Sequence, residues 1–202
     1  MEDPDFVVVN ERTVKAQPEL ATERLILVRP TLEDAPEVFE RYASDPEVTR
    51  FLGWPRHTSV SDTQAFLNYS ASEWERWPAG PYLIRRRSDR WLLGGTGLGF
   101  ESPEQAVTGY VLAKDAWGQG YATEALTAMV DVARQTGVRL LYALCHPEHR
   151  ASSRVLEKCG FVRESDQPKQ AEFPNLAPGV VQDAHRYRLV PDPPRRCKLR
   201  RS

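Results

Sequence analysis

Cysteine is scarce in this sequence, which has only Cys145, Cys159 and Cys197 among its 202 residues. The number is odd, the spacing is never CxxC, and no run of histidines stands nearby. These features argue against a disulfide framework and against a structural zinc site. We therefore expect reduced thiols, no bound metal and a cytoplasmic location.

Long apolar runs and an excess of charge of one sign are also missing. Lysine and arginine together number 27 and aspartate and glutamate 28, so the formal net charge is −1. The N-terminus lacks the basic flank and apolar stretch of a signal peptide, and no segment reaches membrane-spanning length. The sequence therefore predicts neither a membrane nor a nucleic acid as partner.

The composition that remains is that of an ordinary globular domain. Hydrophobic residues make up 41% of the chain and charged residues 27%, and a chain of this length fits one domain with one sizeable core. The apolar stretch near the N-terminus is too short to build a core. We expect an arm over residues 1–20, a single domain over 21–190 and a basic flexible tail over 191–202.

The first part of the domain predicts a strand and two helices. Apolar residues alternate from Arg24 to Arg29, which is typical of a strand, and Pro30 ends it. Capping-box spacing occurs at Thr31 to Asp34 and again at Ser61 to Gln64. These two positions are expected to open helices, and Pro78 ends the second.

The middle of the chain predicts three strands and a long helix. Tyr82 to Arg86, Trp91 to Phe100 and Ala106 to Ala113 are separated by short polar turns, which favours an antiparallel meander. From Gly120 onward the apolar residues recur at helical spacing, and Gly137 is a natural glycine after a helix end.

The last part predicts a strand, a helix and two further strands. Val138 to Leu144 is a compact apolar run suited to a buried strand. Ala151 to Cys159 reads as a short helix that Gly160 closes. Phe161 to Glu164 and Asp183 to Val190 are expected to complete the sheet.

The loop before the long helix has the layout of an anion-binding site. Residues 117–122 read Trp-Gly-Gln-Gly-Tyr-Ala and stand directly between a strand and a helix. Gly118 and Gly120 let the backbone approach a phosphate, and the free N–H groups and dipole of the helix start attract it. Neither a P-loop nor a GxGxxG fingerprint is present. Taken alone, such a pair of glycines more often makes a turn than a binding site.

A second motif changes this balance. Residues 149–161 read His-Arg-Ala-Ser-Ser-Arg-Val-Leu-Glu-Lys-Cys-Gly-Phe. With the glycine loop, the opening Thr22 to Leu27 and the strand around Gly95 to Gly97, it resembles the GNAT N-acetyltransferases, and more narrowly their RimJ/RimL-like branch. The resemblance covers residues 22–190.

The resemblance implies an α+β fold with a mixed, mostly antiparallel sheet of about six or seven strands and helices on both faces. It also implies a V-shaped splay between the strands that end near Ala113 and Cys145, where acetyl-CoA enters as co-substrate. One strand edge would pair with the pantetheine amides, and the glycine loop would hold the pyrophosphate. The cofactor-binding residues implied are Val111, Leu112, Ala113, Trp117, Gly118, Gln119, Gly120, Tyr121, Ala122, Thr123, His149 and Ser152.

Two positions depart from the family pattern. Trp117 stands where Gln or Arg is usual, as in many members of the RimJ/RimL-like branch. His149 stands where the second helix usually begins with an Asn that contacts the cofactor. An imidazole there could replace that contact, take part in proton transfer, or be a solvated residue, which is the commoner case.

For catalysis the resemblance implies direct attack of the amine on the thioester in a ternary complex, with backbone N–H near Val111 or Leu112 stabilising the oxyanion. Ser152 is the candidate for protonating the CoA thiolate, or else a residue that bonds its own helix start. Glu101 is the candidate general base, with Tyr110 placing a water relay. Both are also compatible with strand-end or core roles.

The leading hypothesis is therefore N-acetylation of a primary amine. The branch favours protein or peptide N-termini over small amines, although a fold does not fix the acceptor. The alternative is a catalytically idle acyl-CoA-binding regulatory module, motivated by His149 and by the lack of a secure base. The resemblance is also compatible with a homodimer.

Overall fold

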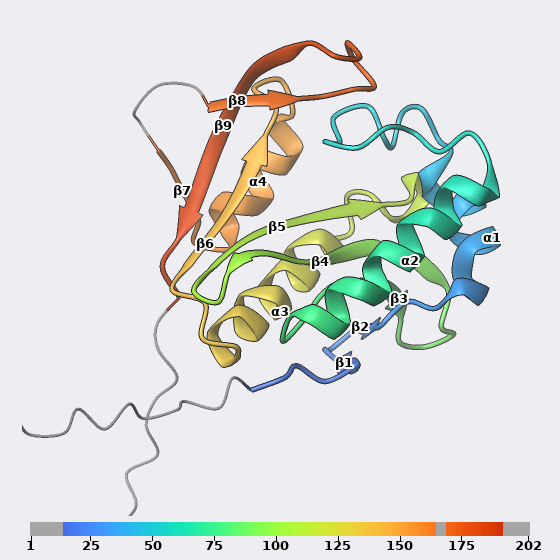
Figure 1. The fold of residues 1–202 in the computed structure, drawn as a ribbon, viewed down its shortest axis with the longest axis horizontal. Helices are drawn as coiled ribbons and strands as arrows, with labels where there is room; N and C mark the ends of the chain where they lie inside the picture. Colours follow the sequence, from blue (N-terminus) through green and yellow to red (C-terminus); the bar gives the residue numbers. More distant parts are fainter. Residues whose placement is uncertain (1–13, 165–168, 192–202) are drawn as a thin grey trace, which may run out of the picture.

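The computed structural model describes residues 14–164 and 169–191, which form one sheet with helices on both faces (Figure 1). Residues 1–13 of the expected arm and 192–202 of the expected tail lie outside the described residues. The strands are β1 (Glu19–Ala21), β2 (Leu25–Val28), β3 (Pro81–Arg86), β4 (Leu92–Ser102), β5 (Gln105–Leu112), β6 (Leu140–Cys145), β7 (Val162–Arg163), β8 (Lys169–Glu172) and β9 (Val181–Leu189). The helices are α1 (Ala35–Val38), α2 (Val60–Arg76), α3 (Tyr121–Gln135) and α4 (Arg150–Lys158), with short turns η1 (Leu32–Asp34), η2 (Phe39–Ala43) and η3 (Lys114–Ala116).

The sheet is mixed and mostly antiparallel, as predicted. Its order is β1-β2-β3-β4-β5-β6-β9-β7, and β8 pairs with β9. The described residues hold nine strands, because β1 and β8 add to the seven that the sequence indicated. These two strands have three and four residues and lack the run of apolar residues that marked β2. β1 therefore places Glu19 and Leu20, the last two residues of the expected arm, in the sheet.

The predicted splay lies between β5 and β6, the one parallel pair of the sheet among the described strands. The two strands pair only from Gln105↔Leu140 to Val107↔Tyr142. Beyond that point β5 stays with β4 while β6 stays with β9, and Figure 1 shows the two strands diverging. The second half of β5 is thus left with an unpaired edge.

Alternation along β3 divides the core between the two faces. Tyr82 and Ile84 belong to the larger cluster, to which α3 contributes Met129 and its neighbours. Leu83, between them, belongs to a second cluster with Val38 and Tyr42 from α1 and η2. Helices on both faces are therefore confirmed.

The helix starts show one success and one error of the sequence analysis. The capping box at Thr31 to Asp34 is present. The one predicted at Ser61 is wrong, because the N-cap is Ser59, whose side chain accepts from Asp62 N while the Asp62 carboxylate accepts from Ser59 N. Both serines precede a polar residue three places on, so spacing alone could not choose between them. In the part of the chain described, no helix is long and apolar enough to span a membrane.

Candidate active site

The loop that joins η3 to α3, residues 117–123, is here called the phosphate loop. Gly118 has a φ of 74° and Gly120 a φ of 81°, in the left-handed region that favours glycine. A Cβ at Gly118 would meet nothing within 4 Å, and one at Gly120 would meet only Arg24 Nη2, at 3.4 Å. The backbone conformation therefore requires these glycines, and crowding does not.

The phosphate loop presents a row of free amides. None of the N–H groups of residues 118–123 donates to any residue that the structure describes, and α3 has no side-chain cap. The amides lie at the positive end of the helix dipole. Free amides at a helix start are the arrangement that suits an anion such as a pyrophosphate.

An ion-pair network fixes the phosphate loop to the start of β2. Arg24 donates from Nη1 to Gln119 O at 2.9 Å and from Nε to Glu124 Oε2 at 2.8 Å. Thr22 Oγ1 donates to the same carboxylate at 2.6 Å. Burial alone would raise the pKa of Glu124, but the hydrogen bonds from Thr22 and Arg24 lower it. The sequence analysis noted Thr22 to Leu27 and the loop separately and did not link them.

Hydrogen bonding at the end of β5 decides which backbone groups face the splay. The Ala113 amide donates to Leu93 O on β4 at 2.7 Å. Successive residues of an antiparallel strand point their N–H and C=O groups to opposite sides. The backbone N–H and C=O groups of Val111 and Ala113 therefore face β4. Leu112 faces the splay, with its carbonyl accepting from Trp117 Nε1 at 2.8 Å. Of the three residues expected to pair with pantetheine, only Leu112 points its backbone N–H and C=O groups into the splay. By the same alternation, the backbone groups of Tyr110 also face the splay.

Tyr110 and Ser152 meet across the splay. The Tyr110 hydroxyl lies 2.9 Å from Ser152 Oγ and 3.1 Å from Ser152 O, where it donates. Burial raises the pKa of Tyr110 above its usual value, although the hydrogen bond with Ser152 opposes this. The phenol is therefore protonated at neutral pH and available as a donor. The structure brings together these two predicted residues, from β5 and α4.

Glu101 lies elsewhere. Its carboxylate accepts hydrogen bonds from Tyr142 and Gln105. Tyr142 occupies the last paired position of β6 before the strands diverge, at the closed end of the splay. Glu101 is not among the described residues that line the cavity shared by Tyr110 and Ser152.

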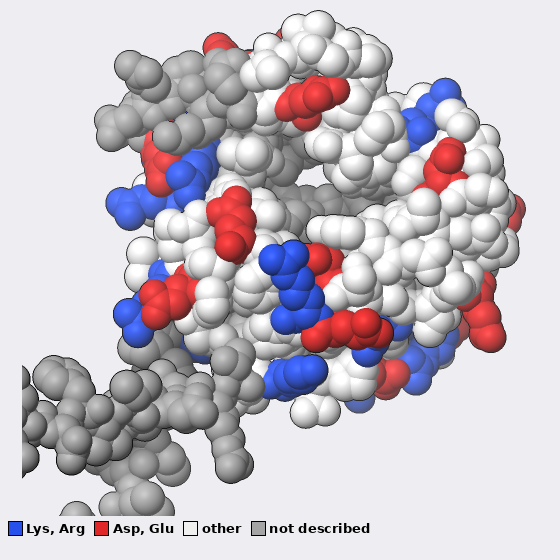
Figure 2. Space-filling view, in the orientation of Figure 1, with Lys and Arg blue, Asp and Glu red and all other residues white. Residues whose placement is uncertain are grey.

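That cavity has a volume of about 1010 Å³ and opens beside the free half of β5. Figure 2 shows this face hollowed between the part with β8 and β9 and the part with α2. Asn175 ties the two sides together by donating to Thr49 O and Trp54 O, at 2.7 and 2.9 Å. Its side-chain oxygen accepts from Arg56 N at 2.7 Å. The α1–α2 connection and the β8–β9 connection thus close one rim of the cavity.

His149 lines the cavity and is half-buried, so it is not the exposed residue that is common before a helix. Its ring stacks on Phe51 at 4.8 Å, and His146 stacks on the same ring at 5.0 Å. Burial, reinforced by His146, lowers the pKa of His149. The imidazole is therefore neutral at neutral pH.

A splayed sheet, a helix start with free amides at one end of the gap and a deep cavity at the other define the fold of an acetyl-CoA-dependent acetyltransferase. The family described as "Acetyltransferase (GNAT) domain" matches residues 24–162, and the chain belongs to this family. The protein is accordingly an acetyltransferase of the GNAT type, as the sequence resemblance implied.

Similar proteins act on different amines. The chain is 29% identical to the uncharacterised N-acetyltransferase YoaA of Bacillus subtilis, over 86% of this chain and 97% of YoaA. The structure of RimL, a ribosomal L7/L12 alpha-N-protein acetyltransferase, with coenzyme A has a TM-score of 0.71 at 22% identity, covering 85% of this chain and 96% of RimL. The structure of spermidine N-acetyltransferase from Vibrio cholerae, with CoA and spermine, has a TM-score of 0.70 at 15% identity. The match covers 84% of this chain and 97% of that enzyme. The last two likenesses show the fold alone.

Proposed function

We propose that this protein transfers the acetyl group of acetyl-CoA to a primary amine by direct attack in a ternary complex. The observation that carries the proposal is the row of free amides in residues 118–123, which follows the unpaired end of β5, where Trp117 Nε1 donates to Leu112 O. The amides of the phosphate loop would hold the pyrophosphate, and Leu112 and Tyr110 would pair with pantetheine. His149 lies beside Ser152 in the cavity wall and would contact the same arm.

In the proposed reaction the amine nitrogen bonds to the carbonyl carbon and the carbon–sulfur bond breaks. The Leu112 N–H, which faces the splay, stabilises the oxyanion. Ser152 gives its hydroxyl proton to the departing thiolate and regains one from water, which carries the proton lost by the amine, while the Tyr110 hydroxyl, 2.9 Å away, holds the Ser152 side chain in position. Proximity of the two substrates supplies much of the acceleration.

The attacking amine must lose a proton before or during the reaction. Glu101 is outside this proposal, because Tyr142 and Gln105 occupy its carboxylate away from the cavity. A free α-amine titrates near pH 8 and an alkyl amine near pH 10.4, so the neutral fraction at physiological pH is sizeable for the first and below about 1% for the second; in both cases water can accept the proton. No side-chain base is therefore assigned.

The acceptor is a primary amine, either a peptide N-terminus or a small molecule. RimL supports the first and spermidine N-acetyltransferase the second, and both are relatives in fold only. A cytoplasmic location and a homodimer stay predictions.

The test combines acetyl-CoA titration by calorimetry with release of CoA thiol on a panel of amines. Gly120→Asp places a carboxylate at the phosphate loop and should weaken acetyl-CoA binding at least about 100-fold. Gly120→Asn is the matched control, because Asn tolerates the left-handed region and carries no charge. Equal affinities of the two variants would contradict the loop assignment. Tight binding without thiol release on any amine would instead support the idle regulatory module.

A further inference from the structure

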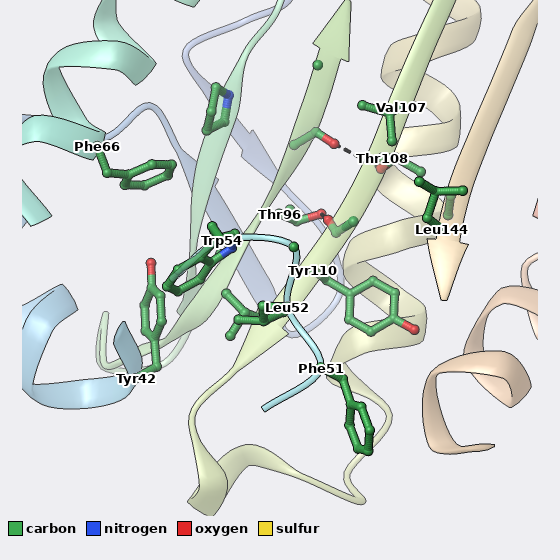
Figure 3. A pocket seen from close by; sticks show the side chains of 18 of the residues that line it. Tyr42, Phe51, Leu52, Trp54, Phe66, Thr96, Val107, Thr108, Tyr110 and Leu144 are labelled. Atoms are coloured by element: carbon green, nitrogen blue, oxygen red, sulfur yellow. Dashed lines mark hydrogen bonds between the residues drawn. The ribbon is translucent and has the colours of Figure 1, made fainter. Parts of the chain in front are cut away.

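One part of the cavity is built from aromatic side chains. Trp54, His57 and Phe66, here called the aromatic lobe, come from the α1–α2 connection and from α2. The Trp54 and His57 rings lie 5.1 Å apart, and those of His57 and Phe66 lie 6.3 Å apart. In Figure 3, Trp54 and Phe66 lie on one side of the pocket, and Tyr110 and Leu144 lie on the other. All three rings are only partly buried, so they offer surface to a ligand.

His57 adds no positive charge to the aromatic lobe at neutral pH. Its Nδ1 is hydrogen-bonded to Thr63 Oγ1 at 2.8 Å. Burial lowers the pKa of His57, although the carboxylate of Asp62 opposes this. The ring is therefore a neutral, flat wall.

The carboxylates that line the cavity are already engaged. Asp62 accepts from Thr58 N and Ser59 N at the start of α2. Glu172 accepts from Gly179 N at 2.9 Å. Glu73 lies close enough to the Tyr69 hydroxyl to raise its pKa. At Asp62 and Glu172 these hydrogen bonds hold the side chain in place through one carboxylate oxygen.

The floor of the cavity is equally short of polar groups. Thr96 donates its hydroxyl proton to Gly109 O at 2.8 Å, and Thr108 donates to Gly97 O at 2.9 Å. Figure 2 shows that the atoms around the hollow are mostly uncharged. A ligand that enters the cavity therefore loses contact with water and gains contact with aromatic and aliphatic side chains.

We propose that the acceptor is a monoamine with a flat, apolar body of about the size of one aromatic ring, which packs between Trp54 and Phe66. This inference rests on the proposed acetyl transfer and names its substrate class. A polyamine has no flat body to place against the rings, and its second ammonium would lose water on entering the apolar part of the cavity. An aromatic body gains both apolar burial and favourable ring contacts.

The test measures kcat/KM for CoA thiol release with 2-phenylethylamine, spermidine and a serine-initiated tripeptide amide. The expected value for 2-phenylethylamine is at least tenfold higher than for either of the others. A higher value for spermidine or for the serine peptide overturns the inference.

Variants assign the preference to the aromatic lobe. Trp54→Ala and Phe66→Ala should each reduce the preference for 2-phenylethylamine over spermidine at least about fivefold, with the KM for acetyl-CoA unchanged. Trp91→Ala is the matched control. Trp91 is 45% exposed, makes a cation–π contact with Arg41 and does not line the cavity. If both lobe variants reduce kcat/KM equally for all three amines, the aromatic lobe has only a structural role and the inference is wrong.

Failure of the proposed acetyl transfer is distinguishable from failure of this inference. If no amine releases thiol, calorimetry of 2-phenylethylamine and of spermidine against the CoA-bound protein still ranks the two ligands. Tighter binding of 2-phenylethylamine that Trp54→Ala removes would support the apolar pocket, and tighter binding of spermidine would overturn it.

Discussion

The phosphate loop, at the proposed cofactor end, and the aromatic lobe, at the proposed acceptor end, would bind their ligands by different means. The loop offers backbone amides that two left-handed glycines expose, so the chemistry hardly depends on the remaining side chains. The lobe is made of side chains, and two of them, Trp54 and His57, stand on a connection that Asn175 holds in place. An enzyme family can therefore keep the first end while the second diversifies, which is how one fold serves different amines. Changes at one end should leave the other intact.

The largest effect is expected where the two ends meet, at Tyr110 and Ser152. Ser152→Ala removes the proposed proton donor, and Tyr110→Phe removes the group that supports it. Each should lower kcat about 100-fold while the KM values for acetyl-CoA and amine change little. Steady-state kinetics with both substrates varied measures this. Ser153→Ala is the neighbouring control, and a kcat within twofold of wild type in both test variants would remove the pair from the mechanism.

A smaller effect, confined to the cofactor end, is expected from the Arg24 network. Arg24→Ala frees the Gln119 carbonyl and half of the Glu124 carboxylate. The guanidinium is partly exposed, so we expect about a tenfold rise in the KM for acetyl-CoA, equivalent to about 1.4 kcal/mol. S-acetylpantetheine has no pyrophosphate and should show no change.

Two comparisons decide whether Arg24 acts through the phosphate loop. Arg139→Ala, which removes an exposed pair with Glu104, should leave both KM values unchanged. Equal losses with acetyl-CoA and with S-acetylpantetheine in Arg24→Ala would show a general loss of structure and would contradict the assignment.

Loss of the Asn175 hydrogen bonds should weaken binding of the amine. Asn175→Ala removes three hydrogen bonds to the segment that carries Trp54. We expect a severalfold rise in the KM for the amine, an unchanged KM for acetyl-CoA and a loss of about 1–2 kcal/mol in the free energy of unfolding. Urea denaturation and steady-state kinetics measure these changes, with Asn68→Ala on the exposed face of α2 as control. A change in the acetyl-CoA KM as large as that for the amine would show that the two ends are coupled.

The contrast between the two ends also explains what the sequence could predict. The phosphate loop was predictable because its glycines, its helix start and the preceding strand are contiguous. The hydrogen bonds of Asn175 could not be predicted, because they join segments that are far apart in the chain and that only the fold brings together. The same holds for Arg24 and Glu124.

Errors at single residues have equally local causes. Glu101 ends a strand, which suggested a base, but strand position does not fix where a side chain finds its partner, and Tyr142 holds it. The cap of α2 was placed two residues late because Ser59 and Ser61 both satisfy the spacing. Pairing with pantetheine was assigned to a run of three residues, whereas strand geometry lets only alternate residues face the splay.

The smallest expected effect is a dependence of stability on pH through His149. Burial lowers its pKa in the folded state below the unfolded value of 6.5. Between the two pKa values the unfolded chain binds more protons, so the free energy of unfolding falls as the pH drops below 6.5 and is unaffected above it. His149→Phe keeps a ring against Phe51 but cannot take up a proton. Its unfolding free energy should fall less between pH 7.5 and pH 5.5 than that of the wild type, with a remainder from His57 and His185, whose pKa values are lowered too. Identical losses in urea denaturation at the two pH values would show that His149 takes up its proton without opposing the fold.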